Sequence, residues 1–279
     1  MTGRRRAVLA ALLLIEAATM TTTAAAGATC PTSAYDTRVL ADAPIAYWPL
    51  GTIPAQQPSA PDCSGHGHIG TYVNTPNTTT MPNGDLAQQF DGSTQYVEFP
   101  DAPDLSLTAT GRLTIEAWMR PATLQFTDQE GSGYVHWLGK GTSNQQEYVA
   151  RMYSQVNSEN RPNRISGYAF NLTGGLGVGS YFQDPVSTAE WIHVVIVINT
   201  ADTSGSYPSG YTRIYKNGVL RDTDSLAGLD ITPGNGTAPF RIGTRDFASY
   251  FEGRIGKVAI YDYELSAADI ADHNNTMRA

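Results

Sequence analysis

The acidic residues of this 279-residue chain do not form the pairs that cleavage of a glycosidic bond requires. That reaction needs two carboxyl groups, one to protonate the leaving oxygen and one to act as nucleophile or base. Glu116 has no second acid on its predicted strand, and Arg120 follows four residues later. Glu98 and Asp101 flank a predicted strand end, where turn or solvated roles are expected. We therefore assign no catalytic residues.

Aromatic side chains are the second set with recognisable chemistry. A flat ring can stack on the C–H face of a sugar while polar neighbours bind its hydroxyl groups. The residues that we single out as candidate ligand platforms are Trp137, Tyr134, Tyr181, Tyr207 and Tyr211. Ordinary core or surface packing is the alternative for each of them.

The two cysteines, Cys30 and Cys63, indicate oxidising surroundings. Residues 1–26 have the order of a secretory signal peptide, with basic residues first, an apolar run over 7–15, and small residues up to Ala26. An even pair of cysteines in an exported chain predicts one disulfide. We therefore expect a secreted protein with a bond between Cys30 and Cys63.

The composition and the lengths of the apolar runs argue against a nucleic-acid partner and against a membrane span. Only 16% of the residues are charged and the formal net charge is −8, whereas nucleic-acid binding needs a basic patch. Beyond the signal segment, no apolar run is long enough to cross a bilayer. We expect neither a nucleic-acid partner nor a membrane span.

The elements that must position these residues are short strands. Apolar and polar residues alternate over 95–99 and 113–120, and 191–199 is apolar on both faces, as in a covered central strand. Asn217-Gly218 predicts a type I′ hairpin turn. Ser266 with Asp269 predicts the cap of one short C-terminal helix. The pattern is that of a single all-β domain built as an antiparallel sandwich.

Several segments in this order resemble a known family. They are 39–50, 62–71, Phe90-Asp91-Gly92-Ser93 with Tyr96-Val97, 113–118, 191–194, 214–218 and 251–261 with Leu265-Ser266. The chain resembles the laminin-G-like, concanavalin A-like jelly-roll domains of secreted bacterial proteins over about residues 38–275. The resemblance implies two curved antiparallel sheets packed face to face. We accordingly expect one jelly-roll domain over 30–275.

The resemblance also implies where sites would lie. Laminarinase-like relatives carry Glu-x-Asp-x-x-Glu on one strand, and this chain has no such run. Lyase-like relatives use His, Tyr, Arg and Gln on the concave sheet, where the corresponding residues would be His136, Tyr148, Arg151, Tyr153 and Tyr168.

A structural Ca²⁺ ion at the rim is a further property of many relatives. Calcium takes six to eight oxygen ligands, and the carboxylates of Asp62 and Asp91 are the best candidates here. A capping or turn role is the alternative for both side chains.

We interpret the chain as a secreted, non-catalytic recognition module for a polysaccharide, a glycoprotein glycan or an extracellular protein. Because the fold alone does not determine function, two alternatives stay open. One is a carbohydrate-cleaving hydrolase or lyase on the same sandwich, and the other is a structural surface or assembly protein.

Overall fold

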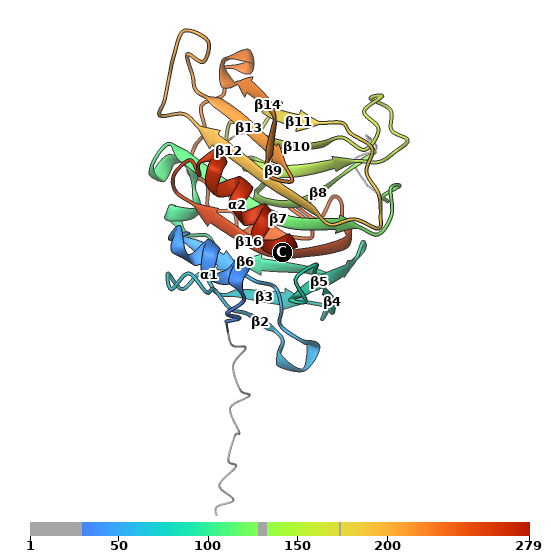
Figure 1. The fold of residues 1–279 in the computed structure, drawn as a ribbon. Coiled ribbons are helices and arrows are strands. Elements are labelled where there is room, and N and C mark those ends of the chain that lie inside the picture. The colour runs from blue at the N-terminus through green and yellow to red at the C-terminus, as the bar shows by residue number, and fades with distance from the viewer. Residues whose placement is uncertain (1–29, 128–132, 173) are drawn as a thin grey trace, which may run out of the picture.

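The computed structural model describes residues 30–127, 133–172 and 174–279, and these form two packed antiparallel sheets of eight strands each (Figure 1). The predicted signal peptide over 1–26 lies outside the described residues. None of the described helices is long and apolar enough to cross a membrane. The predicted sandwich is confirmed.

The first sheet has the order β14-β13-β12-β7-β16-β5-β4, with β1 also paired to β16. Its strands are β1 (Ala46–Trp48), β4 (Asn77–Thr80), β5 (Leu86–Asp91), β7 (Arg112–Pro121), β12 (Ile192–Asn199), β13 (Tyr211–Lys216), β14 (Val219–Ser225) and β16 (Glu252–Tyr261).

The second sheet has the order β11-β10-β9-β8-β15-β6-β3-β2. Its strands are β2 (Ser59–Ala60), β3 (Gly70–Val73), β6 (Tyr96–Phe99), β8 (Tyr134–Thr142), β9 (Gln145–Tyr153), β10 (Ile165–Ala169), β11 (Val178–Phe182) and β15 (Phe240–Ile242). Short 3₁₀ turns lie at Pro54–Gln56, Pro103–Leu105, Leu107–Ala109 and Leu226–Leu229.

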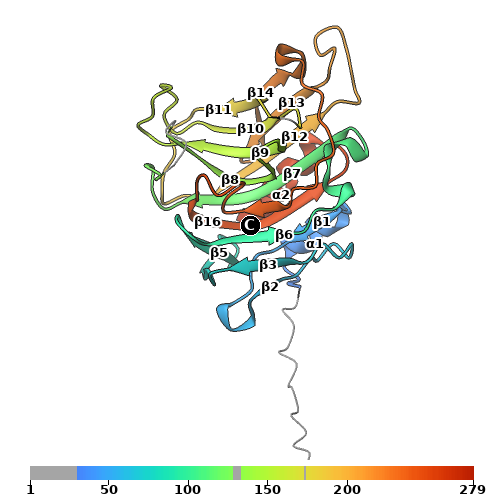
Figure 2. The ribbon, with the colours of Figure 1, turned by 180° about the vertical axis from the view of Figure 1, so that it is seen from behind.

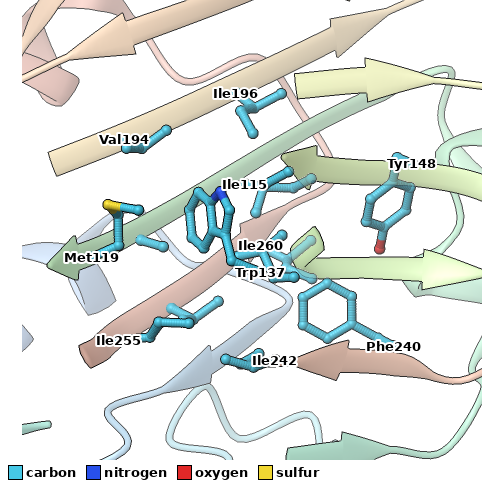
Figure 3. Packing of buried hydrophobic residues seen from close by; sticks show 14 of the residues in the cluster. Ile115, Met119, Trp137, Tyr148, Val194, Ile196, Phe240, Ile242, Ile255 and Ile260 are labelled. Carbon is cyan, nitrogen blue, oxygen red and sulfur yellow. The ribbon is translucent and has the colours of Figure 1, made fainter. Parts of the chain in front are cut away.

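The main core fills the space between the two sheets. Because side chains alternate between the faces of a strand, each strand sends every second residue inward. Isoleucine, valine and aromatic side chains from both sheets meet there (Figure 3). Every residue of β12 is buried, as its two-sided apolar pattern predicts.

The predicted turn between β13 and β14 is also confirmed. Lys216 pairs with Val219, and the two residues between them have positive φ, 53° at Asn217 and 81° at Gly218. Asn and Gly tolerate this conformation at little steric cost, which is why the sequence places the turn here.

Two helices cover the outer face of the first sheet, where one was predicted (Figure 1). The predicted helix is α2 (Ala267–Arg278), capped by Ser266. The helix that we did not predict is α1 (Ala34–Ala41), in a region whose end resembles the family's opening strand. It begins with a capping box, in which Ser33 and Asp36 satisfy each other's backbone N–H groups.

A buried polar cluster fastens both helices to the sheet. The Glu116 carboxylate on β7 accepts a hydrogen bond of 2.7 Å from the Tyr35 hydroxyl of α1 and one of 3.1 Å from Tyr261. It also lies 2.7 Å from Nε2 of His193 and 2.9 Å from Nδ1 of His273 in α2. We call these five residues the Glu116 cluster.

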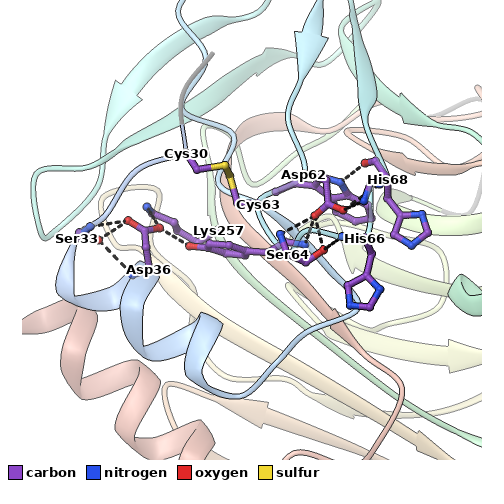
Figure 4. The surroundings of a disulfide bond; sticks show 12 residues. Cys30, Ser33, Asp36, Asp62, Cys63, Ser64, His66, His68 and Lys257 are labelled. Atoms are coloured by element: carbon purple, nitrogen blue, oxygen red, sulfur yellow. Dashed lines mark hydrogen bonds and ion pairs between the residues drawn. A yellow bond between two sulfur atoms is a disulfide. The ribbon is translucent and has the colours of Figure 1, made fainter. Parts of the chain in front are cut away.

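The predicted disulfide between Cys30 and Cys63 ties the chain ahead of α1 to the loop before β3 (Figure 4). Close by, the fully buried Lys257 pairs with Asp36 at 2.6 Å and with Asp85 at 2.8 Å. The covalent bond and the ion pairs therefore hold the N-terminal segment against the first sheet.

Replacing both Cys30 and Cys63 by serine should lower the free energy of unfolding by about 3–4 kcal/mol. The bond spans 33 residues, and its loss frees that loop in the unfolded chain. Urea titration of the oxidised and double-serine proteins measures the effect. Reduced wild-type protein is the control and should match the variant, whereas equal midpoints for oxidised and double-serine protein would contradict the prediction.

Candidate functional site

A cleft of about 500 Å³ opens on the outer face of the second sheet. On β9, Ala150 and Met152 belong to the core, so Arg151 and Tyr153 point to the opposite face. His136 of β8 lies directly across from Arg151, and Tyr168 of β10 lines the same cleft. We call it the tyrosine–arginine cleft.

The Arg151 guanidinium lies at the centre of the cleft. Its carbon is 3.9 Å from the ring centroid of Tyr134 and 4.8 Å from that of Tyr168, so the cation stacks on both rings. Its Nε donates to Nε2 of His136 at 3.3 Å, and its Nη1 donates to the Tyr153 hydroxyl at the same distance. The arginine is thus held in one orientation.

His136 is a neutral acceptor in this arrangement. Burial is the main cause that lowers its pKa, to about 3. The contact with Asp246 opposes this shift in pKa, and repulsion from Arg245 and Arg151 adds to it. The imidazole is therefore uncharged at neutral pH and can accept the Arg151 hydrogen bond through Nε2.

The rim of the cleft combines charged and apolar side chains. Arg161 donates to the Tyr153 hydroxyl at 2.9 Å and pairs with Glu159 at 2.6 Å. The lining also includes Leu229 and Leu176, and Leu176 is 77% exposed. Such a surface offers both stacking area and hydrogen-bond donors to a ligand.

Two further arginines lie on this side of the second sheet, each with its own carboxylate. Arg245 lines the cleft and pairs with Asp246, while Arg241 pairs with Glu98 at 2.7 Å. Burial alone would raise the pKa of Asp246, but the contacts with His136 and Arg245 outweigh it and hold that pKa well below its usual range.

The residues that the family resemblance suggested for this face are largely brought together. His136, Arg151, Tyr153 and Tyr168 meet at the cleft, whereas Tyr148 points into the core and donates to the backbone oxygen of Leu105 at 2.8 Å. Sequence reasoning missed Arg161, Arg245, Leu176 and Leu229. Arg245, Leu176 and Leu229 come from other parts of the chain and carry no local signal.

The five candidate ligand platforms do not form one site. Tyr134 lines the cleft. Tyr181 is 38% exposed on β11, outside the cleft, with the Arg164 guanidinium 3.8 Å above its ring. Tyr207 and Tyr211 stack edge-on at 5.3 Å beside the first sheet, where Tyr211 donates to Glu264.

Trp137 is corrected from a candidate platform to a core residue. It is 1% exposed and lies between the sheets, surrounded by Ile115, Val194 and Ile255 (Figure 3). The physical reason is the strand period, since Trp137 shares the inward face with Val135. A β-bulge between His136 and Leu138 lets Leu138 point inward as well.

The carboxylates of Asp62 and Asp91 organise loops. Asp62 accepts hydrogen bonds of 2.9–3.0 Å from four backbone N–H groups, those of Tyr47, Ser64, Gly67 and His68 (Figure 4). Asp91 accepts three such bonds, from residues 93 to 95.

These surroundings do not fit a calcium ion, which needs oxygen ligands where the two loops supply N–H donors. Within the described ranges, no group of three or more His, Cys, Asp or Glu side chains could hold a metal. Calcium binding stays a prediction from the sequence, and we derive no function from it.

Glu116, an acid that the sequence placed within a predicted strand, is inaccessible. It is fully buried beneath α1 and α2 and surrounded by hydrogen-bond donors. Its position fits a role in stability.

Comparison with known proteins supports this architecture. The family described as the Concanavalin A-like lectin/glucanases superfamily, of laminin G type, matches residues 91–271. No curated protein matched the chain in sequence.

Solved structures with the same fold include domain 4 of AbnA, an extracellular GH43 arabinanase from Geobacillus stearothermophilus, in complex with arabinotriose. That domain is 15% identical with a TM-score of 0.57, and the match covers 83% of this chain and 98% of the domain.

Part of the binding domain of botulinum neurotoxin DC has the same fold, and that domain was solved with SialylT and with rat synaptotagmin II. In the SialylT complex the identity is 17% and the TM-score is 0.60, over 85% of this chain. The match covers 52% of the neurotoxin domain, so this chain spans about half of that domain's length.

Proposed function

The chain belongs to the concanavalin A-like lectin/glucanase superfamily, and on that premise we propose that it is a recognition module that binds a glycan in the tyrosine–arginine cleft without cleaving it. The observation that carries this proposal is the cleft itself, with two tyrosine rings near a fixed guanidinium and two leucines in its lining. A sugar ring needs this combination of stacking surface and hydrogen-bond donors.

Proteins of similar fold have been solved with bound ligands of the proposed class. The arabinanase domain was solved with arabinotriose. The neurotoxin binding domain, of which this chain matches about half, was solved with SialylT. Both are distant relatives, so the argument for this chain depends on its own cleft.

Burial of two candidate proton-transfer groups, His136 and Tyr153, favours binding over a lyase reaction. A base and an acid must reach the substrate within hydrogen-bond distance. His136 is 1% exposed and Tyr153 is fully buried, and both are already bonded to Arg151. They position the arginine and expose almost no surface of their own to a ligand.

The disulfide and the fold are consistent with our proposal of an extracellular location, since such bonds persist in oxidising compartments. An extracellular protein is the alternative partner. The neurotoxin binding domain, of which this chain matches about half, was solved in complex with rat synaptotagmin II.

Binding should be lost when a ring of the cleft is removed. We expect Tyr168→Ala to weaken binding to a glycan found by array screening by about tenfold or more, because truncating a central aromatic contact removes more than about 1 kcal/mol. Titration calorimetry measures this loss. Tyr207→Ala is the matched control, since it makes the same change beside the other sheet and should leave the affinity unchanged.

Two results would contradict the proposed function. One is equal binding by wild type and Tyr168→Ala. The other is the appearance of new reducing ends or ultraviolet-absorbing unsaturated products after incubation of the bound glycan with the protein. Failure to bind any glycan would instead favour a protein partner.

A further inference from the structure

Among the residues that the structure describes, the side chains lining the tyrosine–arginine cleft have a net charge opposite to that of the whole protein. Arg151, Arg161 and Arg245 line it, while Glu159 is the acidic side chain among the lining residues. Even when Asp246, the partner of Arg245, is counted, the cations outnumber the carboxylates among the described residues there. The chain as a whole has a formal net charge of −8, so an acidic ligand would be attracted to this cleft in particular.

Arg151 differs from its neighbours in having no carboxylate partner among the described residues. Arg245 and Arg161 pair with Asp246 and Glu159, respectively. Arg151 instead contacts two tyrosine rings, the Tyr153 hydroxyl and the neutral His136. Its positive charge is therefore not neutralised by an acidic side chain in the described part of the protein.

The guanidinium also retains hydrogen-bonding capacity. Nε and Nη1 each donate one bond, and Nη2 has no acceptor among the described residues. The guanidinium carbon lies over the rings of Tyr134 and Tyr168, so Nη2 is the group that is left to bond a ligand. A guanidinium edge matches the two oxygens of a carboxylate, and such charge-assisted bonds are about twice as strong as neutral ones.

We propose that the sugar unit bound at Arg151 carries a carboxylate, so that the ligand is an acidic, uronate-type glycan. The inference rests on the proposed function of the cleft. The stacked rings and the bonds to His136 and Tyr153 already fix the arginine, so little side-chain freedom is lost when it binds the ligand.

The test compares oligomers of galacturonate, mannuronate, guluronate and hyaluronan with the same oligomers after chemical reduction of their carboxyl groups. At least one acidic oligomer should bind wild-type protein about tenfold or more tightly than its reduced form. Arg151→Gln should abolish this difference, and Arg151→Lys should restore only part of it, because lysine keeps the charge without the planar pair of donors.

Arg164→Gln is the matched control. Arg164 also stacks on a tyrosine, Tyr181, on the same sheet but outside the cleft, so its loss should leave the acidic preference intact. Thermal unfolding of each variant confirms that it is folded before binding is measured.

The outcomes separate the two proposals. Equal binding of acidic and reduced oligomers, or an acidic preference that survives in Arg151→Gln, would overturn the carboxylate assignment. If neutral oligomers still bound and Tyr168→Ala removed that binding, the proposed function would stand. A stronger preference for dextran sulfate would assign the anion as sulfate and also overturn the inference. Absence of all oligosaccharide binding would overturn both.

Discussion

Replacing Glu116 by alanine is expected to lower the free energy of unfolding by about 3–5 kcal/mol. The substitution removes the shared acceptor of the Glu116 cluster and leaves its tyrosine and histidine donors buried without that partner. Such losses are large because the remaining polar groups keep their desolvation cost. Urea titration measures the change.

Asp202→Ala is the matched control for Glu116→Ala. It removes a carboxylate that pairs with Arg112 at 2.7 Å, but both side chains are exposed to solvent. Exposed pairs contribute little to stability, so the unfolding midpoint should hardly move. Equal effects of the two substitutions would show that the Glu116 cluster does not hold the helices.

The same cluster should make stability depend on pH in two windows. Burial alone would raise the pKa of Glu116, but the two histidines outweigh it and hold that pKa well below 4.5. This contribution is present above pH 4.5 and is lost as the pH falls further. Burial alone would lower the pKa of His273, but Glu116 raises it above 6.5, so its contribution is present below pH 6.5 and is lost as the pH rises.

Glu116→Gln is the variant that isolates this pH dependence, because it keeps the shape of the side chain without its charge. We expect the decline of stability above pH 6.5 to be flatter in Glu116→Gln than in wild type. Parallel curves of unfolding free energy against pH would show that Glu116 does not set the pKa of His273.

Local patterns were sufficient to predict most of the fold. The alternation of apolar and polar residues predicted β7, and the run that is apolar on both faces predicted β12. Asn217-Gly218 predicted the hairpin between β13 and β14. Each of these signals depends only on neighbouring residues. The helix α1 was missed although Ser33 and Asp36 have the same spacing as Ser266 and Asp269. An eight-residue helix is marginal alone and is stabilised here by contacts with distant residues.

The candidate site was harder to predict because it depends on pairing between strands. Resemblance placed Arg151 and Tyr168 on one sheet, but their distance follows from the register of β9 and β10. The cluster around Glu116 shows the same difficulty, since Tyr35 and His273 lie 81 and 157 residues away from it in the chain. No local pattern specifies such contacts.

Trp137→Ala is expected to lower the free energy of unfolding by about 3–5 kcal/mol while leaving the affinity of the folded protein for its glycan unchanged. The indole fills space between the sheets, and its removal leaves a cavity that neighbours such as Ile115 and Val194 can fill only in part. Trp137→Phe should lower the free energy of unfolding much less, because Nε1 of Trp137 has no hydrogen-bond partner within the described residues and phenylalanine lacks that group.

Tyr168→Ala should give the opposite pattern, with weakened binding and nearly unchanged stability, since Tyr168 lies in the open cleft. Urea titration and calorimetry on the three variants separate the two roles. If Trp137→Ala bound glycan poorly at unchanged stability, Trp137 would be a ligand platform after all.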